Sequence, residues 1–362
     1  MCWENFAGEQ GFKNGEKNVC LNKAIQRGGE AVEQDFQLVS VDAANAKHVG
    51  AVFQSVYGND FPIQYVYQPE AVAAEIAAER LTAVLAFDAE GQPAGYVSMF
   101  KNAPNFQLWE VGNMVVNPVY RQSRLSLLLA NCCQSAELMN IAGSDGLYSE
   151  AVCHHYMTQV GSAKAGMADY ALEIDQLAGS SFKEHCADTE RISCVFNFIE
   201  YTKPSLPTYI PNVYEDMART LLQPLKKRDI LVSTAALPQQ GNLRQEEKYY
   251  EFAGTWKLAV WETGATWSED VAALLAEAAR RNVVSLQVAV NMALPHLGAA
   301  VEELRKQGFF FGGVLPRWFG SDGLLMQVVL GGEPNFAGAK LYTQTARTLR
   351  QYCQADWELR KT

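Results

Sequence analysis

The sequence lacks three features that would direct its interpretation at once: a basic cluster, a long apolar run and a paired-cysteine motif. Its 30 Lys and Arg residues are outnumbered by 40 Asp and Glu, which gives a formal net charge of -10. No basic run exceeds Lys226-Lys227-Arg228. Nucleic acids and anionic membranes bind a concentrated basic face, so neither is an expected partner.

The missing apolar run and cysteine motif exclude further classes. No apolar run approaches the roughly 20 residues that span a bilayer. The first 18 residues also lack the apolar segment of a secretory signal, so the sequence predicts a cytoplasmic protein. None of the eight cysteines forms a CxxC pair, so a zinc knuckle is not expected. Cys132, Cys153 and Cys194 have apolar neighbours and are predicted to be buried.

Length and composition indicate a globular protein of two domains. The chain has 362 residues, of which 48% are hydrophobic and 19% charged. We predict a polar N-terminal arm at 1–35, a first domain at 36–200 and a second at 212–362. The segment 201–211 contains three prolines and is predicted to be a linker.

The predicted fold is α/β, with a mixed, mostly antiparallel twisted sheet flanked by helices in each domain. Periodicity in the first domain gives the order β-α-α-β-β-β-α-β-α-β-β. A helix predicted at 121–140 separates the strands 105–116 and 147–153, so these two are expected to be parallel neighbours. The second domain repeats part of this order, with helices at 212–228, 268–280 and 297–307 between strands.

The stretch VVNPVYRQSRLSLLL, residues 115 to 129, carries the first chemical signal. A helix starting near Arg121 would present unpaired N–H groups at its positive end, where a pyrophosphate can bind. Arg121 and Arg124 add charge, and Ser123 and Ser126 add hydroxyl donors. If the preceding strand also splays from its parallel neighbour, an amide-bearing arm can pair with it, which suggests coenzyme A. The alternative is a capped helix start without a ligand.

This stretch resembles the acyl-CoA motif of the GNAT superfamily of N-acyltransferases. The matching residues are Val115, Val116, Pro118, Arg121, Arg124, Ser126 and Leu128, although both motif glycines are replaced, by Arg124 and Ser126. Downstream, AVCHHYMTQVGSAKAGM resembles a second family signature. There His155 stands at the Asn position and Ser162 at the Tyr position, while Lys164, Gly166 and Met167 match Lys-x-Gly-Phe.

The resemblance covers residues 36–200 and implies acetyl-CoA as co-substrate, with no metal. It also implies a set of coenzyme-binding residues: Met114, Val115, Val116, Arg121, Gln122, Ser123, Arg124, Leu125, Ser126 and His155. The second half looks like a degenerate GNAT-like domain. Its turn ATWSED has two acids and no base, which would repel phosphate, so that half is expected to be structural or to shape the acceptor site.

Catalysis in this family is direct attack of an amine on the thioester, which needs a base and an acid. Glu110 lies on the strand leading to the motif and is the candidate base; the alternative is an exposed strand carboxylate. Ser162 replaces the usual Tyr acid, and Tyr156 or His155 are its possible substitutes. Adjacent residues on a strand face opposite ways, so His154 and His155 do not predict a metal site. Cys153 has no base at a defined spacing.

We therefore predict an N-acetyltransferase that acts on an unidentified amine. The alternative within the same fold is a non-catalytic acyl-CoA-binding regulatory or scaffolding protein. An unrelated α/β protein is the third possibility. The sequence indicates no oligomeric state.

Overall fold

The computed structural model describes residues 18–27, 30–133, 143–182, 191–202, 206–225 and 227–360. The chain divides into two compact units. The smaller takes in residues up to 100 together with 112–142, and the larger comprises 101–111 and 143–362. These units do not coincide with the predicted domains 36–200 and 212–362, and the tandem arrangement of two GNAT-like domains stays a prediction.

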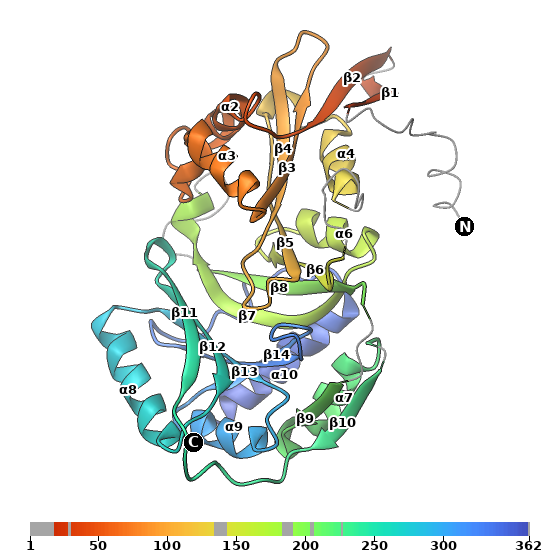
Figure 1. Cartoon of the computed structure of the whole chain (residues 1–362). Coiled ribbons are helices and arrows are strands. Elements are labelled where there is room, and N and C mark those ends of the chain that lie inside the picture. The colour runs from red at the N-terminus through yellow and green to blue at the C-terminus, as the bar shows by residue number, and fades with distance from the viewer. Residues whose placement is uncertain are drawn as a thin grey trace. The chain divides into compact units, whose positions relative to one another are not determined.

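The smaller unit is built on antiparallel strands (Figure 1). Their order is β1 (Asn18–Arg27), β2 (Glu30–Ser40), β3 (Leu81–Phe87), β4 (Pro93–Phe100) and the last part of β5 (Leu108–Val116). The predicted hairpin is confirmed as β3 and β4. The expected loose arm at 1–35 is corrected, because β1 and β2 pair over much of it. Apolar residues alternate at positions 19, 21 and 25, a strand pattern that the polar composition obscured. Residues 1–17, 28 and 29 lie outside the described part.

Helices cover both faces of this sheet. The helices α2 (Lys47–Tyr57) and α3 (Pro69–Ala77) share a buried cluster with β3 and β4. The helix α4 (Leu125–Cys132) packs on β4 from the other side (Figure 1). Gly95 permits this contact, because a Cβ there would lie 2.9 Å from Leu129 Cδ1 and 3.1 Å from Leu125 Cδ2.

The larger unit has a mixed sheet whose strands do not follow chain order. In spatial order these are β5 (first part), β6 (Gly146–Val152), β8 (Arg191–Glu200), β7 (Ala168–Ala178), β14 (Phe310–Leu315), β15 (Gly323–Val329), β13 (Ser285–Asn291), β12 (Thr255–Glu262) and β11 (Arg244–Tyr250). The pairs β5/β6 and β12/β13 are parallel and the others antiparallel. The predicted fold class, a mixed and mostly antiparallel sheet flanked by helices, is confirmed.

The helices of the larger unit are mostly where the sequence places them. They are α6 (Met157–Lys164), α7 (Glu215–Leu222), α8 (Trp267–Arg280), α9 (Leu297–Lys306) and α10 (Gln344–Glu358). The predicted linker 201–211 is corrected, since it contains β9 (Leu206–Ile210), which pairs in parallel with β10 (Arg228–Val232). The helix predicted at 212–228 is shortened to α7. The helix α10 was not predicted, because few apolar residues mark its buried side.

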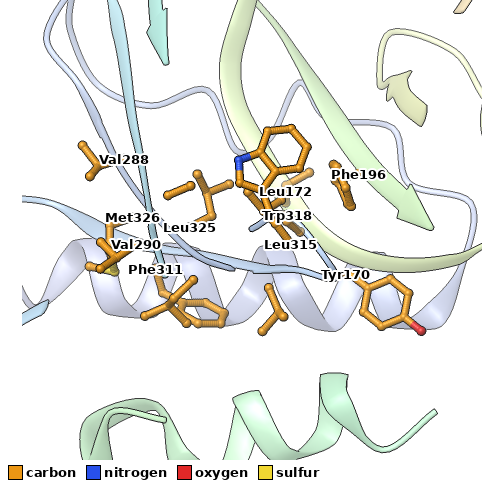
Figure 2. Close-up of a cluster of buried hydrophobic side chains, with 14 of the residues drawn as sticks. Tyr170, Leu172, Phe196, Val288, Val290, Phe311, Leu315, Trp318, Leu325 and Met326 are labelled. Atoms are coloured by element: carbon orange, nitrogen blue, oxygen red, sulfur yellow. The ribbon is translucent and has the colours of Figure 1, made fainter. Parts of the chain in front are cut away.

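A continuous apolar cluster fills the larger unit (Figure 2). Trp318 packs edge-on against Tyr148, with ring centroids 5.3 Å apart, and against Phe196 at 5.8 Å. The cluster also includes Leu172, Phe311 and residues from both halves of the chain. Tyr148 therefore packs against two aromatic side chains of this cluster, Phe196 and Trp318. The predicted burial of Cys132, Cys153 and Cys194 is confirmed.

Candidate functional site

The turn after β5 leads into α4 through a short 3₁₀ segment, Pro118–Tyr120. Asn117 Oδ1 accepts a hydrogen bond from the Val119 N–H at 3.2 Å, and the Tyr120 hydroxyl donates to Asp88. The helix begins at Leu125, so the predicted start near Arg121 is wrong. Ser123 Oγ accepts a hydrogen bond from the N–H of Leu125, the first residue of the helix, at 3.1 Å.

This turn presents backbone donors to solvent. Gln122, Arg124 and Ser126 are exposed, and within the described residues their N–H groups make no hydrogen bond. Arg121 is also exposed. Backbone donors at a helix start, next to two arginines, form an arrangement that binds anions. The residues predicted for pyrophosphate binding are thus brought together in the smaller unit.

The strand β5 changes its pairing along its length. Its parallel ladder with β6 runs from Leu108 to Glu110, and the last pair is Glu110 with Tyr148. The strand continues to Val116, and Asn113 takes a left-handed conformation with φ of 53°. Met114 is exposed and Val115 is buried. The end of the ladder at Glu110 agrees with the splay expected from the sequence.

Glu110 is the best placed of the candidate catalytic residues. Its Oε2 accepts two hydrogen bonds, from Asn102 Nδ2 at 2.8 Å and from the Tyr148 hydroxyl at 2.9 Å. Its Oε1 makes no hydrogen bond among the described residues. Burial, and then the charge of Glu150, raise the pKa of Glu110 to about 7. The side chain is partly buried, so the alternative of an exposed strand carboxylate is wrong.

A buried charge cluster adjoins Glu110, and sequence reasoning missed it. Lys257 Nζ lies 2.7 Å from Glu150 Oε1 and 2.8 Å from Glu173 Oε1. The side chains of Lys257, Glu150 and Glu173 are 16%, 14% and 4% exposed. Gln176 donates to Glu150 Oε2. Glu173 Oε2 and Gln176 Oε1 are buried without a hydrogen-bond partner among the described residues.

The charges in this cluster are unequal in number, which affects their ionisation. Burial, and then the charge of Glu150, raise the pKa of Glu173 to about 8. Although burial opposes it, the charges of Glu150 and Glu173 raise the pKa of Lys257 well above its usual range. Two carboxyl groups, Glu110 and Glu173, therefore titrate near neutral pH beside one permanent cation.

A second cation and a second tyrosine complete the surroundings of Glu110. Lys248 Nζ donates to the carbonyl oxygen and to Oδ1 of Asn102, both at 2.5 Å, and Asn102 Nδ2 donates to the Tyr250 hydroxyl at 3.3 Å. Burial lowers the pKa of Lys248 and raises that of Tyr250 to about 12. A sequence signal existed for the cluster, because Tyr148, Glu150, Glu173 and Lys257 are polar residues inside otherwise apolar strands.

Ser162 is held by a chain of directed hydrogen bonds. Asn197 Nδ2 donates to Asp169, which turns Asn197 Oδ1 toward Ser149. The Ser149 hydroxyl donates to that oxygen at 3.3 Å. In the 3.1 Å contact between Ser149 Oγ and Ser162 Oγ, Ser162 must therefore be the donor. Its proton points at Ser149, so this arrangement does not favour Ser162 as the acid.

The other candidate acids lie before α6. Tyr156 is 48% exposed and directly precedes the helix. His154 and His155 lie in a bend after β6, with ring centroids 4.2 Å apart, so the expectation that they face opposite sides of a strand is wrong. The described residues contain no group of three His, Cys, Asp or Glu residues that could hold a metal.

Comparisons with known proteins give structural similarity only. No family model and no curated protein matches the chain. The solved structures that align with it include a protein described as a GNAT-family acetyltransferase from Desulfovibrio desulfuricans, which is 16% identical. That alignment covers 45% of this chain and 98% of the other, with a TM-score of 0.33.

Two further structures align over a similar share. A ribosomal-protein-S5-alanine acetyltransferase from Vibrio fischeri is 10% identical over 49% of this chain and 96% of its own, with a TM-score of 0.37. A spermidine/spermine N-acetyltransferase from Vibrio cholerae is 11% identical over 46% and 92%, with a TM-score of 0.35. These TM-scores are all below 0.5, so function must rest on the chain's own residues. Across the described part of the chain, every helix is too short or too polar to cross a bilayer.

Proposed function

We propose that the protein transfers an acetyl group from acetyl-CoA to an amine, with Glu110 as the base. The observation that carries this proposal is the Glu110 carboxyl, whose pKa is raised to about 7. Two donors hold one of its oxygens, and the other makes no hydrogen bond among the described residues. A base with a pKa near the working pH is suited to proton removal.

The pyrophosphate of the coenzyme is proposed to bind at the turn that follows β5, within the smaller unit. The N–H groups of Gln122, Arg124 and Ser126 would bind the pyrophosphate, with charge from Arg121 and Arg124. The loss of the motif glycines is compatible with this role, because none of residues 121–126 has a positive φ. Glycine is required at a position only when φ is positive or a neighbour approaches closely.

The proposed reaction is direct acyl transfer. The amine nitrogen attacks the thioester carbonyl carbon, so an N–C bond forms and the C–S bond breaks. The proton leaving the nitrogen passes to Glu110 Oε1. The thiolate takes a proton from an acid, for which Tyr156 is the exposed candidate before α6. Glu110 then returns its proton to solvent.

The alternative is an acyl-CoA-binding protein without catalysis. The orientation of Ser162 favours it, since the residue at the family's Tyr position donates its proton to Ser149. Under this alternative, acetyl-CoA binds but no amine is acetylated.

Two assays on the full chain test the proposal. Acetyl-CoA in excess of its Kd should raise the Tm, and thiol release with a panel of primary amines should follow. Glu110→Gln should keep the Tm shift and lose thiol release by about 100-fold or more, as expected for a general base. Arg121→Glu should lose the shift.

Glu262→Gln is the matched control, because that carboxylate is exposed on β12. It should behave as the wild type in both assays. A Tm shift without thiol release from any amine would support the non-catalytic alternative. No shift at millimolar acetyl-CoA would contradict both proposals.

A further inference from the structure

The three carboxylates near Lys257 come from three different strands, and Lys257 contacts two of them directly. Glu110 lies on β5, Glu150 on β6 and Glu173 on β7, whereas Lys257 lies on β12. In the order of the sheet, β12 is separated from β7 by β14, β15 and β13. A lysine from the second half of the chain therefore supplies the positive charge that pairs with these carboxylates of the first half.

Lys257 fixes the geometry of the carboxylates as well as their charge. Its Nζ contacts Glu150 Oε1 at 2.7 Å and Glu173 Oε1 at 2.8 Å, and Gln176 donates to the second oxygen of Glu150. Glu150 and Tyr148 are two residues apart on β6, so their side chains point to the same face. Tyr148 is the residue paired with Glu110 and donates to it.

We infer that Lys257 is a positioning residue for Glu110. Lys257 acts through Glu150 and thereby sets the electrostatic environment of the base. This inference rests on the proposed function for its catalytic meaning, but the electrostatic claim can be measured without any substrate.

The other titratable groups near Glu110 also bear on the direction in which its pKa should change. Tyr148 and Tyr250 are neutral at neutral pH, because burial raises both pKa values. Lys248 lies on β11, and its Nζ donates to Oδ1 of Asn102, whose Nδ2 donates to Glu110; these contacts do not involve Lys257. Removing the Lys257 charge leaves Glu150 uncompensated. The negative charge of Glu150 then opposes ionisation of Glu110, so the pKa of Glu110 rises.

The test is a carboxyl titration of the full chain by NMR, with ¹³C-labelled glutamate and Glu110→Gln to assign the Glu110 signal. In the wild type the midpoint is expected at about 7. In Lys257→Met it should rise by on the order of one pH unit, the size expected for one charge at this range in protein. Lys257→Arg should restore the midpoint to within a few tenths of a unit.

A charge-matched variant keeps the test decisive if Lys257→Met does not fold. Lys257→Met with Glu150→Gln removes one charge of each sign and should fold, with its midpoint near that of the wild type. Lys306→Met is the control, since Lys306 is 64% exposed in the same half. It should leave the midpoint unchanged.

Kinetics separate this inference from the proposed function. If acetyl transfer occurs, the acid limb of its pH profile should move upward in Lys257→Met and return in Lys257→Arg. An unchanged Glu110 midpoint in a folded Lys257→Met variant would overturn the inference, whatever the activity. A shifted midpoint in a protein that acetylates no amine would overturn the proposed function and leave the electrostatic role of Lys257 standing.

Discussion

Replacing Glu173 by Gln should stabilise the protein at alkaline pH. Glu173 is 4% exposed, and its pKa is raised from its ordinary value of 4.5 to about 8. Above pH 4.5 the unfolded chain releases this proton while the folded chain keeps it. Because the folded state then binds more protons, the free energy of unfolding falls as pH rises, until Glu173 ionises in the folded state too near pH 8. Glutamine resembles the protonated side chain and carries no such cost.

The size of the effect follows from the raised pKa. At 1.36 kcal/mol per pH unit, the shift corresponds to roughly 5 kcal/mol at full ionisation, and to about 1 kcal/mol near pH 5.5. The difference in unfolding free energy between Glu173→Gln and wild type should therefore grow by about 3 kcal/mol from about pH 5.5 to about pH 8.5. Because only the change of this free-energy difference with pH is compared, any pH-independent difference in packing between Glu and Gln cancels.

Urea unfolding followed by tryptophan fluorescence measures this difference. All tryptophans except Trp3 lie at 101–111 or 143–362, so the signal reports on the larger unit. Glu262→Gln is the control, with a side chain 58% exposed, and its difference from wild type should vary by only a few tenths of a kcal/mol with pH. A difference for Glu173→Gln that shrinks as pH rises would refute the reasoning.

Three further outcomes are expected. If Glu110 is the base, kcat/KM should fall about tenfold per pH unit below about pH 7, in a pH profile of thiol release; a flat profile there would exclude it. Ser162→Ala should change kcat less than about twofold, because its hydroxyl donates to Ser149, whereas loss of a true acid costs about 100-fold or more. Gly95→Ala should destabilise the smaller unit by about 1–3 kcal/mol in hydrogen exchange of β4 amides, since its Cβ would meet Leu129 at 2.9 Å. The control Gly161→Ala, with open space around its Cβ, should cost nothing.

The sequence predicted elements with strong periodicity and missed those without it. The hairpin β3–β4, the parallel pair β5/β6 and the helices α8 and α9 follow from apolar spacing that local packing reinforces. β1, β9 and α10 were missed, because their residues are mixed in polarity and gain order from pairing or docking elsewhere in the fold. Such long-range contacts have little effect on the residue pattern of a short sequence segment.

The candidate site was predictable on β5 and less so beyond it. Glu110 and the turn 121–126 follow one another in the sequence, so one motif marks both. Lys257 and Glu173 are 84 residues apart in the chain, and only the sheet topology brings them together. The hydrogen-bond direction at Ser162 also depends on Asn197 and Asp169, which no spacing connects to it.

The contacts of Lys257 bear on how this chain can be divided or exchanged. A fragment ending near residue 205 would keep Glu150 and Glu173 but lose their cation, and it would leave β7 without β14. Asp169 would also lose Thr343, which caps α10. The prolines at 204–211 look like a natural cutting point, yet the two halves share one interior. If either half were replaced by the corresponding half of a diverged homologue, the new half would have to keep the charges that pair at Lys257.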